Sequence, residues 1–186
     1  LVLAALADGP STVSGALRAR DSLLMGKALA SLGTGIEGLE GTGDVRVTPG
    51  PLQGPAYVDC GLAGNVMRFA PPVAALADGD VRFDGDPRAR VRPMGGVIEA
   101  LEALGVEIDD DGRRTLPFTV KGTGAVRGGE VTIDASASSQ FVSALLMALP
   151  LVSEHDDIVV EVQGELISRP YVDITLKLLA RFGITV

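Results

Sequence analysis

Two loops of small residues are the clearest places where this chain could bind an anion. One is 60–65, which reads CGLAGN, and the other is 135–140, which reads ASASSQ; each leads from an expected strand into an expected apolar helix. Small side chains let a ligand approach the free backbone N–H groups of a helix start, where the helix dipole favours phosphate or carboxylate. The hydroxyls of Ser138 and Ser139 would add donors. A purely capping role is an equally open alternative, because Ser and Asn are preferred at helix starts.

Arginine recurs in three further segments, 18–20, 88–92 and 168–171. In a chain whose formal net charge is -8, positive charge that returns in this way suggests a common face for anions, because a guanidinium group can bind carboxylate or phosphate through two hydrogen bonds. The competing interpretation is ordinary surface charge. In that case the arginines would pair with acidic residues close in the sequence, namely Asp21, Asp84 and Asp86.

Residues that usually carry nucleophilic or metal chemistry are scarce. Cys60 is the only cysteine and His155 the only histidine. No histidine lies near Cys60 in the sequence to activate it as a nucleophile, so we expect a half-buried thiol, and a single cysteine excludes an internal disulfide. One histidine cannot form a histidine cluster, so we predict no metal site.

Composition narrows the class of protein further. Apolar residues make up 46% of the 186 residues and charged residues 22%, which is typical of a folded globular chain. The net charge and an aromatic share of 4% argue against nucleic-acid binding, which needs a basic footprint or stacking platforms. No apolar stretch approaches the roughly 18 residues needed to span a bilayer, so we predict a cytoplasmic protein without a membrane partner.

An internal repeat positions the two loops. The heptapeptide LAALADG at 3–9 returns as VAALADG at 73–79, with a looser third copy further on. Each copy continues through an arginine-containing loop to a second helix that ends in glycine, at Gly33, Gly105 and Gly183. Glycine in this place is typical of the residue that closes a helix.

The repeating unit is a strand, an apolar helix, a strand, an amphipathic helix and two further strands. Apolar helices are expected at 66–77 and 141–151, and amphipathic helices with a charged outer face at 95–104 and 172–182. Strands are expected at 12–13, 45–48, 57–58, 81–83, 118–120, 131–133, 158–162 and 184–186. Pro71 and Pro72 predict a kink or a late start in the helix at 66–77.

The fold class is therefore α/β, one globular domain of three such units, with an inner helix layer surrounded by sheets and outer helices. In the second and third units, a strand that ends in Asp59 or Asp134 precedes the apolar helix, whereas the first unit opens directly on its helix. We therefore expect the first unit to be truncated, with its first strand, loop and helical turn lying before Leu1.

Four motifs in this order resemble the enolpyruvyl transferases, and in particular their branch that acts on shikimate 3-phosphate. They are DCGLAGNVMR at 59–68, DGDPRARVRPM at 84–94, DASASSQF at 134–141 and SRPYVDITL at 168–176. The resemblance covers the whole chain and implies an inside-out α/β fold of two similar domains, each made of three repeat units, with the active site in the cleft between them. Residues 1–186 would then be a single domain, the half that binds shikimate 3-phosphate, with the second domain absent.

The resemblance also implies an activity. The family transfers the enolpyruvyl group of phosphoenolpyruvate to the 5-hydroxyl of shikimate 3-phosphate and releases phosphate, a step of the shikimate pathway toward aromatic amino acids, without a metal or an organic cofactor. The expected partners are these two small-molecule substrates and the second domain, in a monomer. The family's proton-transferring residues have no counterpart in this sequence, so we expect no catalytic residue here and a chain that binds substrate without turnover.

Carried over residue by residue, the resemblance assigns the shikimate 3-phosphate site to two of the motifs. Ser138 and Ser139 match the serines that hold this substrate, and Gln140 lies next to its ring and to phosphoenolpyruvate. Ser168 matches the serine that contacts the substrate phosphate, and Tyr171 lines the same pocket.

The other two motifs carry the phosphoenolpyruvate side. Gly64 matches a glycine that lies against phosphoenolpyruvate, where a larger side chain would collide with it or with the inhibitor glyphosate. Arg88 matches an arginine that binds phosphoenolpyruvate, and Arg68 is expected to position the loop. Asn65 stands where the family usually has Thr, so the resemblance does not extend to its hydrogen bonds.

Two other assignments stay open at this point. The related branch that acts on a UDP-sugar in cell-wall synthesis tends to carry a reactive cysteine in the loop that corresponds to Arg88, whereas the only cysteine here is Cys60. The SSQ motif at 138–140 also favours the shikimate branch. A non-catalytic anion-binding module built on the same repeat is the alternative outside the enzymes, and titration with shikimate 3-phosphate distinguishes it.

Overall fold

The computed structural model describes residues 1–136, 138–151 and 158–186. Its helices are α1 (Val2–Ala5), α2 (Arg20–Ser31), α3 (Gly64–Ala75), α4 (Gly95–Ala103), α5 (Gln140–Ala148) and α6 (Arg169–Arg181), with a 3-10 turn at Leu149–Leu151. Its strands are β1 (Ser11–Val13), β2 (Gly35–Glu37), β3 (Val45–Thr48), β4 (Ala56–Asp59), β5 (Asp78–Asp84), β6 (Glu107–Asp109), β7 (Phe118–Thr123), β8 (Gly129–Asp134) and β9 (Ile158–Gln163). The predicted order is seen in full in unit two (β4 to β7), from the apolar helix onward in unit one (α1 to β3), and as far as the amphipathic helix in unit three (β8 to α6).

Each sheet is built within one unit. The strand orders are β1-β3-β2, β4-β5-β7-β6 and β8-β9. Strands β4 and β5 are parallel, and so are β8 and β9, while the other pairs are antiparallel. A parallel pair needs a crossover, which α3 and α5 supply. Both inner helices therefore begin just after the carboxyl end of a parallel strand.

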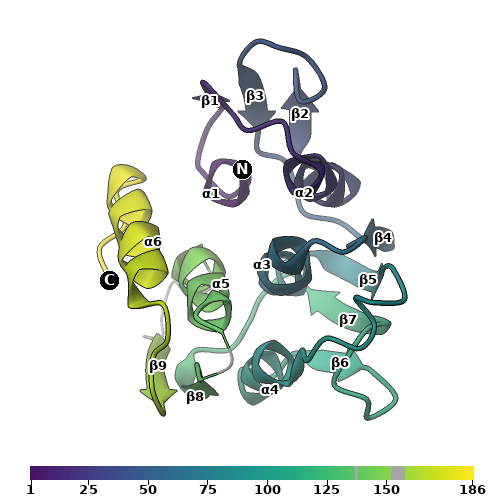
Figure 1. The fold of residues 1–186 in the computed structure, drawn as a ribbon, viewed down its shortest axis with the longest axis vertical. Helices are drawn as coiled ribbons and strands as arrows, with labels where there is room; N and C mark the ends of the chain where they lie inside the picture. The colour runs from purple at the N-terminus through teal and green to yellow at the C-terminus, as the bar shows by residue number, and fades with distance from the viewer. Residues whose placement is uncertain (137, 152–157) are drawn as a thin grey trace.

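The helices α1, α3 and α5 form the interior of the molecule. Figure 1 shows them nearly end-on, with α2 and α4 beside them, α6 next to α5, and the sheets at the periphery. Val66 and Met67 of α3 and Leu145 of α5 are fully buried, which agrees with their apolar sequence and confirms the predicted inner layer. Within the described ranges, no helix is both long and apolar enough to cross a membrane.

Helix α3 runs through both of its prolines. It begins at Gly64, and Pro71 and Pro72 lie buried in its interior. The first turn is already closed before them, since the N–H of Met67 donates to the carbonyl of Ala63 at 3.1 Å. The expectation of a late start is wrong because the loop, rather than the prolines, determines where this helix begins.

The three helix-closing glycines are confirmed. Gly33, Gly105 and Gly183 have φ values of +107°, +84° and +81°, a conformation that glycine adopts readily. In each case the next residue donates its N–H to the carbonyl five residues earlier, as Ile184 does to Leu179 at 3.1 Å. The predicted strand at 184–186 is wrong, since the described structure has no strand there and the Ile184 N–H completes the helix cap instead.

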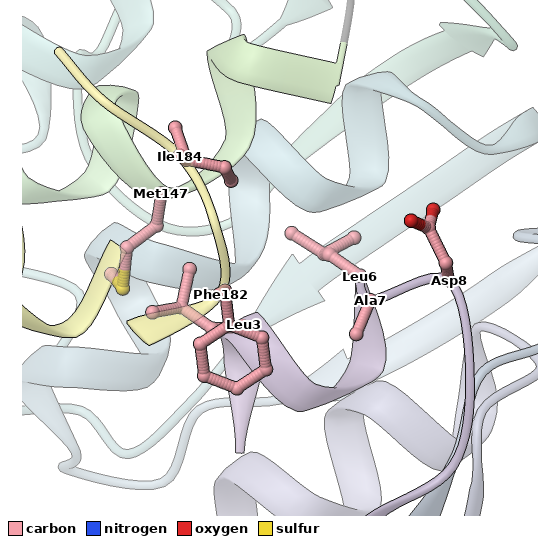
Figure 2. A pocket seen from close by; sticks show the side chains of 7 residues that line it. All are labelled: Leu3, Leu6, Ala7, Asp8, Met147, Phe182 and Ile184. Carbon is pink, nitrogen blue, oxygen red and sulfur yellow. The ribbon is translucent and has the colours of Figure 1, made fainter. Parts of the chain in front are cut away.

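Units one and three meet at a small apolar cavity of about 120 Å³. Its lining residues are Leu3, Leu6, Ala7, Asp8, Met147, Phe182 and Ile184. Figure 2 shows aliphatic and aromatic side chains from α1, from α5 and from the end of the chain gathered around it, with the Asp8 carboxylate at its edge. The cavity is a packing seam between units, because Asp8 is the one polar side chain among its described lining residues and no other converges with it to orient a ligand.

Candidate functional site

A cavity of about 570 Å³ lies between α5 and α6. It is lined by Phe69, Ser138, Ser139, Gln140, Ser143, Met147, Ile167, Ser168, Tyr171, Ile174, Thr175 and Leu178. The structure thus brings together all five residues that the sequence assigned to the shikimate 3-phosphate site, although they come from motifs about thirty residues apart. Two helix starts, those of α5 and α6, supply most of the polar groups.

The start of α5 is organised by short-range hydrogen bonds. Asp134 accepts the N–H of Ser136 at 2.8 Å, and bonding to Ser136 holds the pKa of Asp134 below its usual value. The Ser138 hydroxyl accepts the N–H of Gln140 at 3.2 Å, so Ser138 takes part in capping as well as lining the cavity. Ser139 is 4% exposed. Ala137, within this loop, lies outside the described residues.

The start of α6 has unusual backbone geometry. Ser168 precedes the helix with φ 54° and ψ 37°, the left-handed region, which costs a non-glycine residue on the order of 1 to 2 kcal/mol. Its carbonyl accepts the N–H of Tyr171 at 3.0 Å. Strained residues of this kind often occur at binding sites. The geometry places Ser168 and Tyr171 at the rim of the cavity, where the Tyr171 side chain is 66% exposed.

Among the described residues, no charged side chain lines this cavity. Arg169, which the sequence grouped with the recurrent arginines, is exposed and lies 3.9 Å from Asp173 on the surface of α6. An anion bound here would therefore be held by hydroxyls, by the Gln140 amide and by N–H groups at helix starts. The lining residues that the structure describes also include no carboxylate, lysine or histidine that could transfer a proton.

The start of α3 is cationic by contrast. A Cβ on Gly64 would lie 2.7 Å from Nη2 and 3.0 Å from Nη1 of Arg92, and 3.1 Å from Nη1 of Arg68. Arg92 donates to the carbonyl of Leu62 at 3.2 Å. Two guanidinium groups thus converge on the glycine that the resemblance places against phosphoenolpyruvate.

Arg68 is 3% exposed and has no carboxylate partner among the described residues. It donates to the carbonyls of Gly64 and Pro93 at 3.3 and 3.2 Å, and its guanidinium lies 5.8 Å from the centre of the Phe141 ring. Burial, followed by the charge of Arg92, lowers the pKa of Arg68 to about 10. Arg68 therefore stays protonated at neutral pH and keeps the loop positively charged.

The arginines near this loop divide into two groups. Arg90 forms two hydrogen bonds of 2.8 Å to Asp84, which lower the pKa of that carboxyl, and Arg20 pairs with Asp86 at 3.0 Å. The interpretation as ordinary surface pairs is correct for these two. Arg92 forms no ion pair within the described part of the chain, and neither does Arg88, which is exposed. The guanidinium groups nearest to the Gly64 position belong to Arg92 and Arg68. The sequence grouped Arg92 with the recurrent arginines but assigned Arg88, and not Arg92, to phosphoenolpyruvate.

Three further predictions concern single residues. Cys60 is fully buried rather than half-buried, and burial, with Asp59 adding to it, raises the pKa of its thiol to about 12. Asn65 accepts the N–H of Val66 at 2.8 Å, which satisfies a donor at the start of α3. His155 lies outside the described residues.

Sequence reasoning also missed Ser143 and Thr175, two hydroxyl residues in the cavity lining. Ser143 lies four residues after Ser139, and Thr175 lies four residues after Tyr171. Residues four apart share one helix face. This spacing was the available signal, because each hydroxyl lies one turn deeper than a residue already assigned to the site.

Comparison with known proteins first defines the class of fold. The solved enolpyruvyl transferase NikO from Streptomyces tendae superposes with a TM-score of 0.69 at 21% identity, covering 98% of this chain and 41% of that one. A solved EPSP synthase from Acinetobacter baumannii gives a TM-score of 0.72 at 26% identity, over 81% of this chain and 35% of that one. The fold is therefore that of the enolpyruvyl transferases.

The family model of EPSP synthase (3-phosphoshikimate 1-carboxyvinyltransferase) matches residues 1–186, and the chain belongs to this family. A 3-phosphoshikimate 1-carboxyvinyltransferase from Kocuria rhizophila is 52% identical over 99% of this chain. The chain spans 43% of the length of that relative.

Proposed function

We propose that this chain supplies the shikimate 3-phosphate site of an enzyme that transfers the enolpyruvyl group of phosphoenolpyruvate to the 5-hydroxyl of that substrate, with release of phosphate. The observation that carries the proposal is the convergence of Ser138, Ser139, Gln140, Ser168 and Tyr171 on one cavity. Membership of the EPSP synthase family supports it.

The cavity suits a sugar-like phosphate ester. The serine hydroxyls and the N–H groups at the starts of α5 and α6 would bind the phosphate, because the positive ends of both helices face it. Gln140 would hydrogen-bond to ring hydroxyls, and Tyr171 would cover one side of the ring. Ser168 would reach the phosphate from the opposite helix.

Phosphoenolpyruvate would bind at the start of α3, with Gly64 allowing close approach. Arg92 and Arg68 supply positive charge at that point, and we propose that Arg88, which has no acidic partner among the described residues, adds a third cation when substrate binds. This arrangement would hold the anionic groups of phosphoenolpyruvate on one side of the shikimate ring.

The reaction joins the two sites by addition and elimination. The 5-hydroxyl gives up its proton to a base as its oxygen adds to C2 of phosphoenolpyruvate, and C3 gains a proton from an acid. The resulting tetrahedral intermediate then loses phosphate and a C3 proton to restore the double bond. These proton transfers need an acid and a base, and the described residues that line the cavity include neither. We propose that they come from a second domain of a longer protein, in line with the 43% coverage of the relative.

The alternatives receive less support. The UDP-sugar branch tends to carry a reactive cysteine in the loop that corresponds to Arg88. Residues 84–94 contain no cysteine, and Cys60 is fully buried with its pKa raised to about 12. A non-catalytic module on the same fold would not require the five residues that match the family's substrate-binding residues to line one cavity, as they do here.

Titration of this chain with shikimate 3-phosphate tests the proposal. We expect saturable binding by calorimetry, with amide chemical-shift changes at 138–140, at 167–169 and at Tyr171, and much weaker binding of unphosphorylated shikimate as the control. A phosphate-release assay with both substrates should show no turnover. Absence of saturable binding by the folded chain would favour the non-catalytic module, and measurable turnover would contradict the assignment of the proton-transferring groups to a second domain.

A further inference from the structure

A buried pair of hydroxyls joins α5 to α6 at the floor of the cavity. The Ser143 Oγ and the Thr175 Oγ1 are 2.9 Å apart, and Thr175 Oγ1 is also 3.0 Å from the carbonyl oxygen of Tyr171. Ser143 is 3% exposed and Thr175 is 8% exposed. In the described part of the chain, this is the one side-chain hydrogen bond between the two helices.

The two short contacts give the hydroxyls a direction. Each hydroxyl has one hydrogen to donate. Both contacts are satisfied only if Ser143 donates to Thr175 and Thr175 donates to the Tyr171 carbonyl. If Thr175 donated to Ser143 instead, Thr175 Oγ1 and the Tyr171 carbonyl oxygen would lie 3.0 Å apart with no hydrogen between them. The hydroxyls thus form a chain from α5 to the backbone of the first turn of α6.

The surroundings make this chain a geometric constraint. The neighbouring side chains in the lining, Met147, Ile174 and Leu178, are apolar. Apolar packing alone tolerates small rotations and shifts between helices, whereas a buried hydrogen bond is lost when its donor and acceptor move apart, at the cost of an unsatisfied polar group. The pair therefore limits both the rotation and the sliding of α6 relative to α5.

We propose that Ser143 and Thr175 are positioning residues that set the spacing between the two halves of the binding site. Ser143 lies one turn below Ser139, and Thr175 lies one turn below Tyr171, so fixing the pair fixes the separation of the two helix starts across the cavity. The identity of the ligand rests on the proposed function, but the constraint on the helices does not.

Replacement of Thr175 tests the proposal. Thr175→Val keeps the size and branching of the side chain but removes the hydroxyl, and Thr175→Ser keeps the hydroxyl. We expect the affinity for shikimate 3-phosphate to fall about 3- to 10-fold in Thr175→Val, as loss of one buried hydrogen bond implies, and to stay within about 2-fold of wild type in Thr175→Ser. Thr48→Val, in unit one, is the matched control and should bind as wild type does.

Amide chemical shifts of the ligand-free chain separate this inference from the proposed function. In Thr175→Val, the amide signals of 139–140, of 168–169 and of Tyr171 should shift, while those of Thr175→Ser should stay close to wild type. If wild type does not bind shikimate 3-phosphate, the proposed function fails and these shifts still decide the positioning role. Unmoved amides, or equal losses of affinity in the Val and Ser variants, would overturn it. Ser143→Ala replaces Thr175→Val if the latter does not fold, and the same amides should move.

Discussion

The starts of α3 and α5 occupy the same place in two copies of one structural unit, yet they present different chemistry. Both helices follow the first strand of a parallel pair, and each of these strands ends in an aspartate. That aspartate accepts a hydrogen bond of 2.8 Å from the N–H two residues later: Gly61 donates to Asp59, and Ser136 donates to Asp134. Guanidinium groups surround the first helix start, and hydroxyl groups surround the second.

The difference arises mainly in the segment that leads into the outer helix of each unit. Arg92 lies just before α4 and reaches Gly64, whereas Ser168 lies just before α6 and faces the cavity at the start of α5. The repeated unit thus supplies similar backbone N–H groups at both helix starts. The segments just before α4 and α6 determine whether a charged or a neutral side chain lies beside them. The same backbone arrangement therefore has guanidinium groups beside it at one helix start and hydroxyl groups at the other.

The largest expected effect is the loss of ligand affinity when Ser168, one of the hydroxyl residues of the cavity, is replaced. We expect Ser168→Ala to weaken binding of shikimate 3-phosphate about 10- to 100-fold, the cost of one hydrogen bond to a charged group, measured by calorimetry. Ser168→Gly should lose similar affinity while raising the free energy of unfolding by about 1 kcal/mol, because glycine relieves the left-handed strain. Unchanged affinity in both variants would remove Ser168 from the site.

Two glycine substitutions compare the packing around the two helix starts. A Cβ on Gly96 would lie 2.8 Å from the buried Phe141 ring of α5, so Gly96→Ala should lower the free energy of unfolding by about 1 to 2 kcal/mol. At Gly64 the nearest atoms are the ends of arginine side chains, chiefly Arg92, so Gly64→Ala should change it by less than about 1 kcal/mol. Urea denaturation measures the free energy of unfolding of both variants. Equal losses in Gly96→Ala and Gly64→Ala would show that the arginine side chains near Gly64 are held as rigidly as the Phe141 ring.

A smaller effect should separate Arg92 from other surface arginines. Inorganic phosphate stabilises a folded chain that binds it and so raises the midpoint of unfolding. We expect this stabilisation by phosphate to be about 0.2 to 1 kcal/mol smaller in Arg92→Gln than in wild type. Arg82→Gln removes the same charge from an exposed position on β5 and should respond to phosphate as wild type does. Sodium chloride at equal ionic strength controls for screening. Identical responses of the two variants would argue against an anion site beside Gly64.

The smallest effect is expected at Cys60, which begins the loop into α3. Its pKa is raised to about 12, so the thiol is protonated at pH 8 and becomes the reactive thiolate only at far higher pH. Alkylation of the folded chain at pH 8 should therefore be negligible and should become rapid in urea. Rapid alkylation of the folded chain would show that the loop opens readily.

The repeat made much of the fold predictable from sequence. Gly33, Gly105 and Gly183 marked the ends of the outer helices correctly, because a left-handed helix cap depends on one residue and its neighbours. The helix over Pro71 and Pro72 was harder, because a local rule against proline competes with burial of the whole apolar helix, and burial prevails.

The site was predictable only where its residues lie in contiguous motifs. Ser138, Ser139 and Gln140 follow from one motif, but the contact of Arg92 with Gly64 spans two loops and depends on how they fold against each other. The same holds for the hydrogen bond between Ser143 and Thr175, which forms only when α5 and α6 pack. Such contacts are tertiary: the four-residue spacing places Ser143 and Thr175 on the faces of the assigned residues, but it does not show that the two hydroxyls meet.

Confinement of every described sheet to a single unit has a consequence for how the molecule opens. Because the strand ladders β1-β3-β2, β4-β5-β7-β6 and β8-β9 share no strands, the units are joined chiefly by packing between helices, and one ladder can break without breaking another. Native-state hydrogen exchange should then resolve three cooperative opening events. The two-stranded ladder β8-β9 should exchange first, and ligand bound between α5 and α6 should slow that event most.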